Sequence, residues 1–194
     1  MAALSWQELP AFMSELSVRD GMSARTLEFI ILTATRSGEA RGARWCEVSG
    51  DVWTIPAMRM KRGIEHRVPL SEEALNILER QKGFDSELIF PSLMNSSEKI
   101  AKEQSVMVFK SLLKRMKHDD ITVHGFRSTF RDWCSESARV SRDVAEAALS
   151  HATGNAVERA YARSDLFERR RDLMNRWSAF ATGDTGKVLH LVNA

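Results

Sequence analysis

The chain has 194 residues, 43% of them hydrophobic, and a formal net charge of +2, which suits one globular domain and is too mild to indicate nucleic-acid binding by itself. Its two cysteines, Cys46 and Cys134, are far apart and belong to no C-x-x-C pair, which argues against a disulfide framework and a cysteine zinc site. We expect no membrane span, no secretory signal and a reducing cytoplasm, because no run of 18 apolar residues and no basic-then-apolar leader occurs.

The first part of the chain predicts two helices. A helix is expected over residues 5–18 with Ser5 as its cap, and a second helix follows. Their apolar stripes are Leu9, Phe12, Met13 and Leu16, and then Leu27, Ile30, Ile31 and Ala34. Ser37 and Gly38 are predicted to break the chain after the second helix.

The hydrophobic period then changes to that of strands. Residues Val52–Ile55 and His66–Leu70 predict two strands, with Arg62 and Gly63 at a turn between them. Residues Trp45–Val48 suggest a third strand. A small antiparallel sheet is therefore expected.

Helical patterns return after the sheet. Ser71 is the expected N-cap of a helix that Gly83 ends, and further helices are predicted over 103–117, 126–138 and 142–149. Residues Asp165–Glu168 resemble a capping box that opens a last helix. Its apolar stripe is Leu166, Leu173, Trp177 and Phe180, and the apolar segment Val188–Val192 follows a joint at Gly183–Gly186. The predicted fold class is mainly α with a small antiparallel β-sheet (α+β).

Basic residues fall into four groups along the chain. They are Arg36, Arg41 and Arg44; Arg59, Lys61 and Arg62; Arg127 and Arg131; and Arg159, Arg163, Arg169, Arg170 and Arg171. Any one group is typical of a solvated helix face, whereas the four together can converge in the folded chain.

The last basic group surrounds Tyr161, the only tyrosine of the chain. A lone tyrosine is more often an amphipathic, half-buried residue than a nucleophile. The neighbouring Arg159 and Arg163 shift that balance, because a cationic setting favours phenolate over phenol. A nucleophilic role for Tyr161 still requires partner residues.

Two segments supply histidine and arginine partners. His124 and Arg127 are i, i+3 neighbours on a helix, so both can contact one phosphate, although a single His-x-x-Arg pattern is common by chance. His151 precedes Tyr161 in the sequence Leu149-Ser-His-Ala-Thr-Gly154. A helix-terminal histidine bonded to backbone is an equally good reading of His151.

The first half of the chain adds two more cations. Arg36 follows an apolar helix, and Glu39 can either hold its guanidinium or cap the following segment. Lys61 stands at the tip of the predicted hairpin, where a lysine is usually a solubility device but can also reach into a DNA groove.

In order, Arg36, Lys61, His124, Arg127, His151 and Tyr161 resemble the signature of the tyrosine recombinases, the family of phage integrases. The surrounding segments resemble it as well, especially Met60–Gly63, Arg67–Ser71 and Val123–Arg131, the last being most similar to integrases of prophages and genomic islands. The resemblance covers about residues 20–182. It implies the catalytic-domain fold of these DNA breaking-rejoining enzymes.

The resemblance also implies a mechanism for site-specific DNA recombination. Tyr161 would attack the phosphorus to give a 3′-phosphotyrosine, and Lys61 would act as general acid toward the 5′ oxygen. His124 would assist proton transfer at Tyr161, and His151 would hydrogen-bond the phosphate. Arg36 and Arg127 would bind its oxygens, with Glu39 in support, and no cofactor or metal is expected.

The resemblance further implies a domain plan and partners. Residues 1–183 would form the catalytic domain and 184–194 a tail that docks on a neighbouring protomer, while a disordered terminus is an equal alternative. We expect the family's N-terminal DNA-clamping domain to be absent. The implied partners are double-stranded DNA attachment sites, a homo-tetramer on DNA and accessory excision or DNA-bending factors, in the bacterial cytoplasm at the nucleoid and not at a membrane.

Two alternatives remain at this point. A type IB topoisomerase has nearly the same catalytic residues and would relax supercoiled DNA without a specific site. A non-catalytic DNA-binding remnant of a prophage would have lost activity. The intact set of catalytic positions argues against decay of the site.

Overall fold

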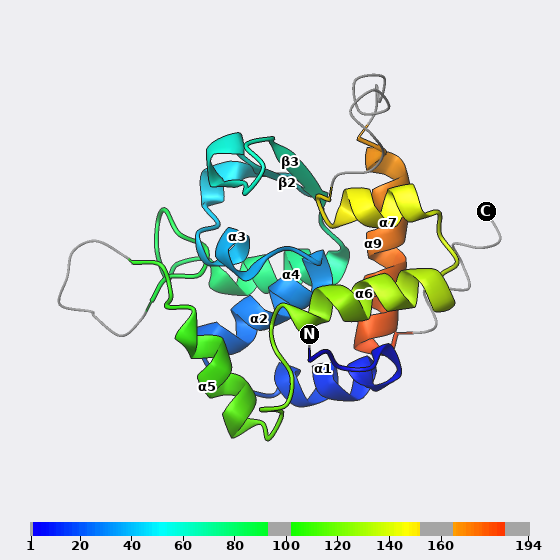
Figure 1. Cartoon of the computed structure of the whole chain (residues 1–194). Helices are drawn as coiled ribbons and strands as arrows, with labels where there is room; N and C mark the ends of the chain where they lie inside the picture. Colours follow the sequence, from blue (N-terminus) through cyan, green and yellow to red (C-terminus); the bar gives the residue numbers. More distant parts are fainter. Residues whose placement is uncertain (1, 93–101, 152–164, 185–194) are drawn as a thin grey trace.

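The computed structural model describes residues 2–92, 102–151 and 165–184 (Figure 1). In chain order its α-helices are α1 (Leu9–Ser17), α2 (Met22–Thr33), α3 (Ser37–Arg41), α4 (Glu72–Gln81), α5 (Met107–Arg115), α6 (Gly125–Glu136), α7 (Arg142–Ala148) and α9 (Phe167–Thr182). The strands are β1 (Val48–Ser49), β2 (Val52–Ile55) and β3 (His66–Pro69). Within these described residues, no helix has the length and apolar character needed to cross a membrane.

Helix α2 is the centre of the core. Most of its side chains are buried, because α1, α4, α5 and α9 all pack against it. Helix α9 is fixed to α2 by a buried hydrogen bond from the Trp177 indole Nε1 to the carbonyl oxygen of Ile31, at 2.8 Å. On another side of α2 the Phe29 ring packs against Trp53, with ring centroids 5.3 Å apart. The core therefore joins the sheet to the helices.

The sheet is antiparallel with the order β1-β2-β3. Trp53 lies opposite Val68, and Ile55 lies opposite His66. These four side chains are buried, so the inward face of the sheet carries one histidine among apolar residues. The sheet lies at the edge of the molecule beyond α3, close to α7 (Figure 1).

Most predicted helices are confirmed, and Ser71 is confirmed as the N-cap of α4, because its Oγ accepts a hydrogen bond from the Ala74 backbone N–H at 3.2 Å. The predicted helix over 5–18 is a 3-10 turn, Trp6–Glu8, followed by α1. The Ser5 side chain caps neither, since its hydroxyl is bound to Gln7. Here the Pro10 ring stands in the first turn of α1, where its missing N–H costs nothing.

Three local predictions were wrong in whole or in part. Ser37 and Gly38 do not break the chain but begin α3. The third strand is Val48–Ser49, because Trp45–Glu47 forms a 3-10 turn whose Glu47 carboxylate accepts from the Trp53 indole at 3.0 Å.

The capping box at Asp165 is the third of these errors. Leu166, with φ 56°, is the N-cap of α9 and makes no side-chain cap. The Asp165 carboxylate instead accepts from the Phe167 backbone N–H at 3.2 Å, and Glu168 pairs with Arg171. The Glu168 carboxylate is therefore paired with Arg171 and does not complete a capping box with Asp165.

The first residues of the chain lie across the beginning of α6. The carbonyl oxygen of Ala2 accepts hydrogen bonds from the backbone N–H and the hydroxyl of Thr122, each at 3.2 Å. The Thr129 hydroxyl donates to the Leu4 carbonyl at 2.6 Å. A Cβ atom on Gly125 would lie 2.3 Å from the Ala2 oxygen, so only glycine fits at this crossing.

We predict that Gly125→Ala destabilises the fold by about 1–3 kcal/mol, because backbone atoms obstruct the added methyl group. Gly38→Ala is the matched control, since its Cβ would meet only the Arg41 side chain at 3.8 Å and alanine favours a helix by about 0.5–1 kcal/mol. Urea denaturation of the two variants measures the difference. Equal stabilities would contradict the close approach at Gly125.

Candidate active site

Arg36 lies where the chain turns after α2. Ala34 closes that helix with φ 52°, and Arg36, in an extended conformation, becomes the N-cap of α3. The Glu39 carboxylate accepts from the Arg36 backbone N–H at 2.8 Å and from its guanidinium Nη1 at 2.7 Å. Glu39 therefore both caps α3 and holds the Arg36 guanidinium. These contacts fix the direction of the Arg36 side chain, which is 23% exposed.

Arg127 on α6 is the buried arginine of the site, with 4% of its surface exposed. Its guanidinium donates to the main-chain carbonyls of Ala34 and Leu149, at the ends of α2 and α7. Burial, and then the positive charge of Arg36, lower the pKa of Arg127 to about 10. Arg127 therefore keeps its charge at neutral pH, close to Arg36.

His151 joins this cluster from the end of α7. Its Nε2 lies 3.0 Å from Arg127 Nη2, and its Nδ1 lies 2.6 Å from the carboxylate of Glu146. His151 is a helix-terminal histidine whose backbone N–H donates to the Glu146 carbonyl, and both of its ring nitrogens also contact side chains. Glu146 was missed by the sequence analysis.

His124 precedes α6 as its N-cap and is largely exposed. Partial burial is the largest cause of the lowered pKa of His124, and neighbouring positive charges lower it further. Those charges come from Arg127, Arg36, His151 and Lys61. Four of the other five predicted residues therefore lie close enough to His124 to influence its imidazole.

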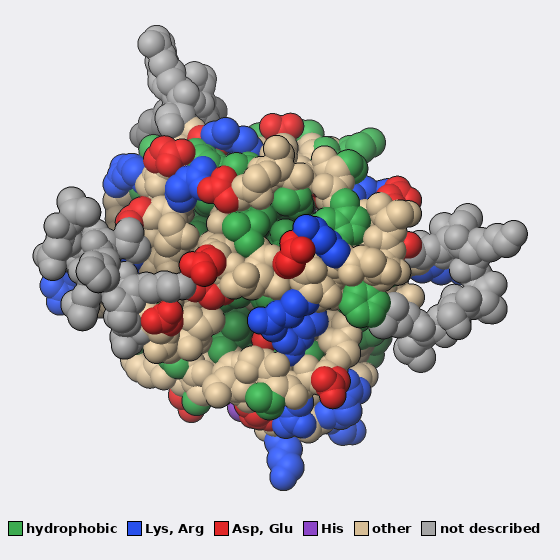
Figure 2. Space-filling model, turned by 180° about the vertical axis from the view of Figure 1, so that it is seen from behind, with side chains coloured by type: hydrophobic (Ala, Val, Ile, Leu, Met, Phe, Trp, Pro, Cys, Tyr) green, Lys and Arg blue, Asp and Glu red, His purple; other side chains and the backbone are tan. Residues whose placement is uncertain are grey.

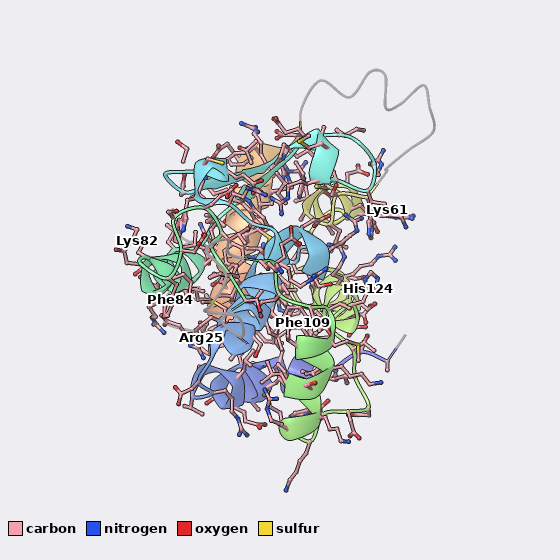
Figure 3. All side chains as sticks on the ribbon, turned by 90° about the vertical axis from the view of Figure 1, so that its left-hand side faces the viewer. Arg25, Lys61, Lys82, Phe84, Phe109 and His124 are labelled. Atoms are coloured by element: carbon pink, nitrogen blue, oxygen red, sulfur yellow. The ribbon has the colours of Figure 1, made fainter. Side chains whose placement is uncertain are left out.

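Lys61 lies in the connection between β2 and β3, which contains a 3-10 turn at Ala57–Arg59 and turns at Gly63 with φ 64°. Its side chain is exposed and points outward at the same edge of the molecule as His124 (Figure 3). Arg25, Lys82 and Phe84 lie at the opposite edge (Figure 3). Lys61 and His124 therefore share one face, the one turned toward the viewer in Figure 1.

Tyr161 and the tail 185–194 lie outside the described residues, so their predicted roles stay predictions. The described residues that border 152–164 are His151 and Asp165. Asp165 accepts from Arg67 of β3 at 2.8 Å and from Arg170 of α9 at 2.9 Å. Both borders are thus fixed by charged contacts to the domain.

His66 on β3 is a second residue that sequence reasoning missed. It is buried, and burial, followed by the charge of Arg170, lowers its pKa to about 4. A hydrogen bond to the Ala148 backbone links it to α7, and the charges of Arg127 and Arg36 also reach it. The sequence offered one signal of this buried imidazole, namely a histidine at an inward-facing position of the predicted strand.

Over residues 2–92, 102–151 and 165–184, no group of three or more His, Cys, Asp or Glu side chains could hold a metal ion. The described part of the site combines Arg36, Arg127 and Lys61 with two imidazoles, those of His124 and His151. The carboxylates of Glu39 and Glu146 contact Arg36 and His151.

Comparison with known sequences points to one family. The profile described as the phage integrase family matches residues 3–167. The prophage integrase IntA of Escherichia coli K12 is 38% identical over 97% of this chain and 46% of its own length. The integrase of Enterobacteria phage P4 is 33% identical over 98% of this chain and 47% of its own length. The chain spans about half the length of the curated relatives it matches.

Solved structures show the same fold. A crystal structure of a lambda integrase(75–356) dimer bound to a COC′ core site has a TM-score of 0.57 at 17% identity, covering 78% of this chain and 57% of that one. A second lambda integrase dimer on a COC′ core site has a TM-score of 0.59 at 17% identity, covering 84% and 48%. The predicted fold class is confirmed.

We predict that His66 makes stability depend on pH between 6.5 and 4. Its folded-state pKa is below the unfolded value, so the unfolded chain binds the extra proton first and stability falls as the pH drops through this window. Wild type should lose up to about 3 kcal/mol more than His66→Gln between pH 7 and pH 4. Urea midpoints at both pH values measure this, and parallel losses would contradict it.

Proposed function

The chain belongs to the phage integrase family and has the catalytic-domain fold of the tyrosine recombinases, and we propose that it performs site-specific DNA recombination through a 3′-phosphotyrosine at Tyr161. The observation that carries the proposal is the convergence of four cations and imidazoles around His124. They are Arg36, Arg127, His151 and Lys61. Prophage or genomic-island integration and excision is the proposed context, from the similarity to prophage integrases.

A phosphodiester resists attack because its negative charge repels the nucleophile and its alkoxide leaves poorly. Arg127 is fixed by main-chain carbonyls and Arg36 by Glu39, so neither guanidinium must reorganise when phosphate arrives. Forked guanidiniums match the non-bridging oxygens better than ammonium groups do. We therefore assign phosphate binding and charge neutralisation to Arg36 and Arg127.

Proton transfers are assigned to the exposed groups. The Tyr161 oxygen forms the bond to phosphorus and gives its proton to His124, whose lowered pKa keeps the ring neutral and able to accept at pH 7. Lys61 donates a proton to the 5′ oxygen as the P–O5′ bond breaks. A free 5′ hydroxyl later attacks the phosphotyrosine, and these proton transfers reverse, so the strand reseals without ATP.

The remaining expectations are part of the same proposal. Residues 1–183 act as the catalytic domain, and 184–194 dock on a neighbouring protomer. Double-stranded DNA attachment sites, a homo-tetramer on DNA and accessory excision or DNA-bending factors are the partners, at the nucleoid in the bacterial cytoplasm. The face opposite the site intersperses acidic and basic side chains (Figure 2), which supports placing DNA on the Lys61 and His124 face.

The two alternatives are less well supported. Type IB topoisomerase activity finds no support in the family match or in the integrase relatives described above. A non-catalytic remnant does not explain why Arg36 and Arg127 remain oriented by Glu39 and by main-chain carbonyls. Relaxation of a supercoiled plasmid that lacks a specific site would favour the topoisomerase.

We predict that the chain forms a covalent adduct with DNA and that Tyr161→Phe forms none, because phenylalanine has no nucleophilic oxygen. The substrate is a pool of nicked duplexes randomised around the nick, from which a cleaved short strand diffuses away and traps the adduct. Denaturing gel electrophoresis and sequencing of the trapped DNA provide the measurement. An adduct that survives Tyr161→Phe would reject this nucleophile.

We also predict that EDTA leaves the rate of adduct formation unchanged, because Arg36, Arg127 and Lys61 supply the positive charge that a metal would otherwise provide. The control adds excess Mg²⁺ back to the treated chain. A rate that falls more than about tenfold with EDTA and returns with Mg²⁺ would contradict metal-independent transfer.

A further inference from the structure

Glu146 on α7 is a buried carboxylate to which the proposed chemistry assigns no role. It is 6% exposed, and a buried charge is costly unless it is paired. Its Oε2 lies 2.6 Å from His151 Nδ1, and its Oε1 lies 2.8 Å from Arg131 Nη2, an ion pair outside hydrogen-bonding geometry. One carboxylate oxygen is therefore directed at His151.

The backbone at the end of α7 also directs His151 toward Glu146. Ser150 has φ 52°, a left-handed conformation that ends the helix as a Schellman motif. In this motif the backbone N–H of His151 donates to the Glu146 carbonyl at 2.9 Å, and that of Ser150 donates to the Ala147 carbonyl at 3.1 Å. His151 is thus bound to Glu146 through both its backbone and its ring.

These contacts determine which ring nitrogen carries the proton. A carboxylate only accepts, so Nδ1 must donate to Glu146. A guanidinium only donates, so Nε2 must accept from Arg127 Nη2, which lies 3.0 Å away. The neutral ring that satisfies both partners is the Nδ1–H tautomer.

We propose that Glu146 is a positioning residue that holds His151 in the Nδ1–H tautomer, with Nε2 directed at Arg127 and the phosphate site. The role of Glu146 in the reaction rests on the proposed function, whereas the tautomer of His151 follows from its contacts alone. Without the carboxylate, an Nε2–H ring would oppose the donors of Arg127 and would turn away. Glu146 therefore acts on the reaction through His151.

A purely structural role is the competing explanation. Glu146 also pairs with Arg131 of α6, so it could serve only to join α6 to α7. Arg131→Ala separates the two roles, because it removes that ion pair and leaves the contact with His151. The Arg131 side chain is 52% exposed, which makes its removal mild for the fold.

The first experiment measures the tautomer without any DNA. Long-range ¹H–¹⁵N spectra of the ¹⁵N-labelled chain at pH 7.5 report which nitrogen of His151 is protonated, with His151→Gln used for assignment. We expect Nδ1–H in wild type and in Arg131→Ala, and a shift toward Nε2–H in Glu146→Met, whose side chain offers Nδ1–H no oxygen acceptor. An Nε2–H ring in wild type, or an unchanged ring in Glu146→Met, overturns the proposal.

The second experiment measures the coupling in a double-mutant cycle. Adduct formation on the nicked duplex pool is followed in wild type, Glu146→Met, His151→Gln and the double variant. We expect Glu146→Met to slow wild type about 10–100-fold and to slow the His151→Gln background less than about twofold. Equal losses in both backgrounds overturn the proposal.

A second variant covers the case in which Glu146→Met does not fold. Glu146→Asp keeps the charge while retracting the carboxylate by one methylene, and we expect it to keep the Nδ1–H tautomer but to slow adduct formation. An Nε2–H ring in Glu146→Asp overturns the proposal. If wild type forms no adduct, the proposed function fails, whereas the spectra still decide whether Glu146 orients His151.

Discussion

The site depends on the burial of one guanidinium. Arg127 sits inside the domain and donates from its two Nη atoms to the carbonyls of Ala34 and Leu149 and to the ring of His151, while its buried Nε has no hydrogen-bond partner among the described residues. A buried cation left without these acceptors would be strongly destabilising, so the ends of α2 and α7 must stay against α6. The energetic requirement of folding and the geometric requirement of a phosphate site are therefore met by the same contacts. Arg36 can then stand beside Arg127 because Glu39 compensates its charge.

The sequence predicted the helices well because burial of an apolar stripe determines them. Helices α2 and α9 follow their stripes, and their packing on each other buries Trp177 completely. Prediction failed where a polar side chain decides the local backbone. Ser37 and Gly38 are helical because the carboxylate of Glu39 caps α3, and Glu47 turns the segment before β1. Such contacts are tertiary or reciprocal, so residue preference alone does not reveal them.

The residues of the candidate site also divide into those that the sequence could predict and those that it could not. Arg36, Lys61, His124, Arg127 and His151 could be selected from chain order and family resemblance. The described structure brings the other four close enough to His124 for their charges to act on its imidazole. Glu146 and His66 could not be selected, because a glutamate in a short helix and a histidine in a strand are ordinary in a sequence. Their importance arises from burial beside charges that only the fold supplies. Tyr161 lies outside the described residues, and its proposed role rests on the family resemblance.

The hydrogen bonds that fix Arg127 also constrain which sequence changes the site tolerates. Two of its acceptors are main-chain oxygens, at Ala34 and Leu149, and every residue type carries the same carbonyl. A substitution that keeps the backbone in place at either position therefore leaves the acceptor of Arg127 unchanged. An inserted or deleted residue in either helix end would move the oxygen itself. The anchorage of the guanidinium thus depends on the spacing of the chain around these two positions more than on their side chains.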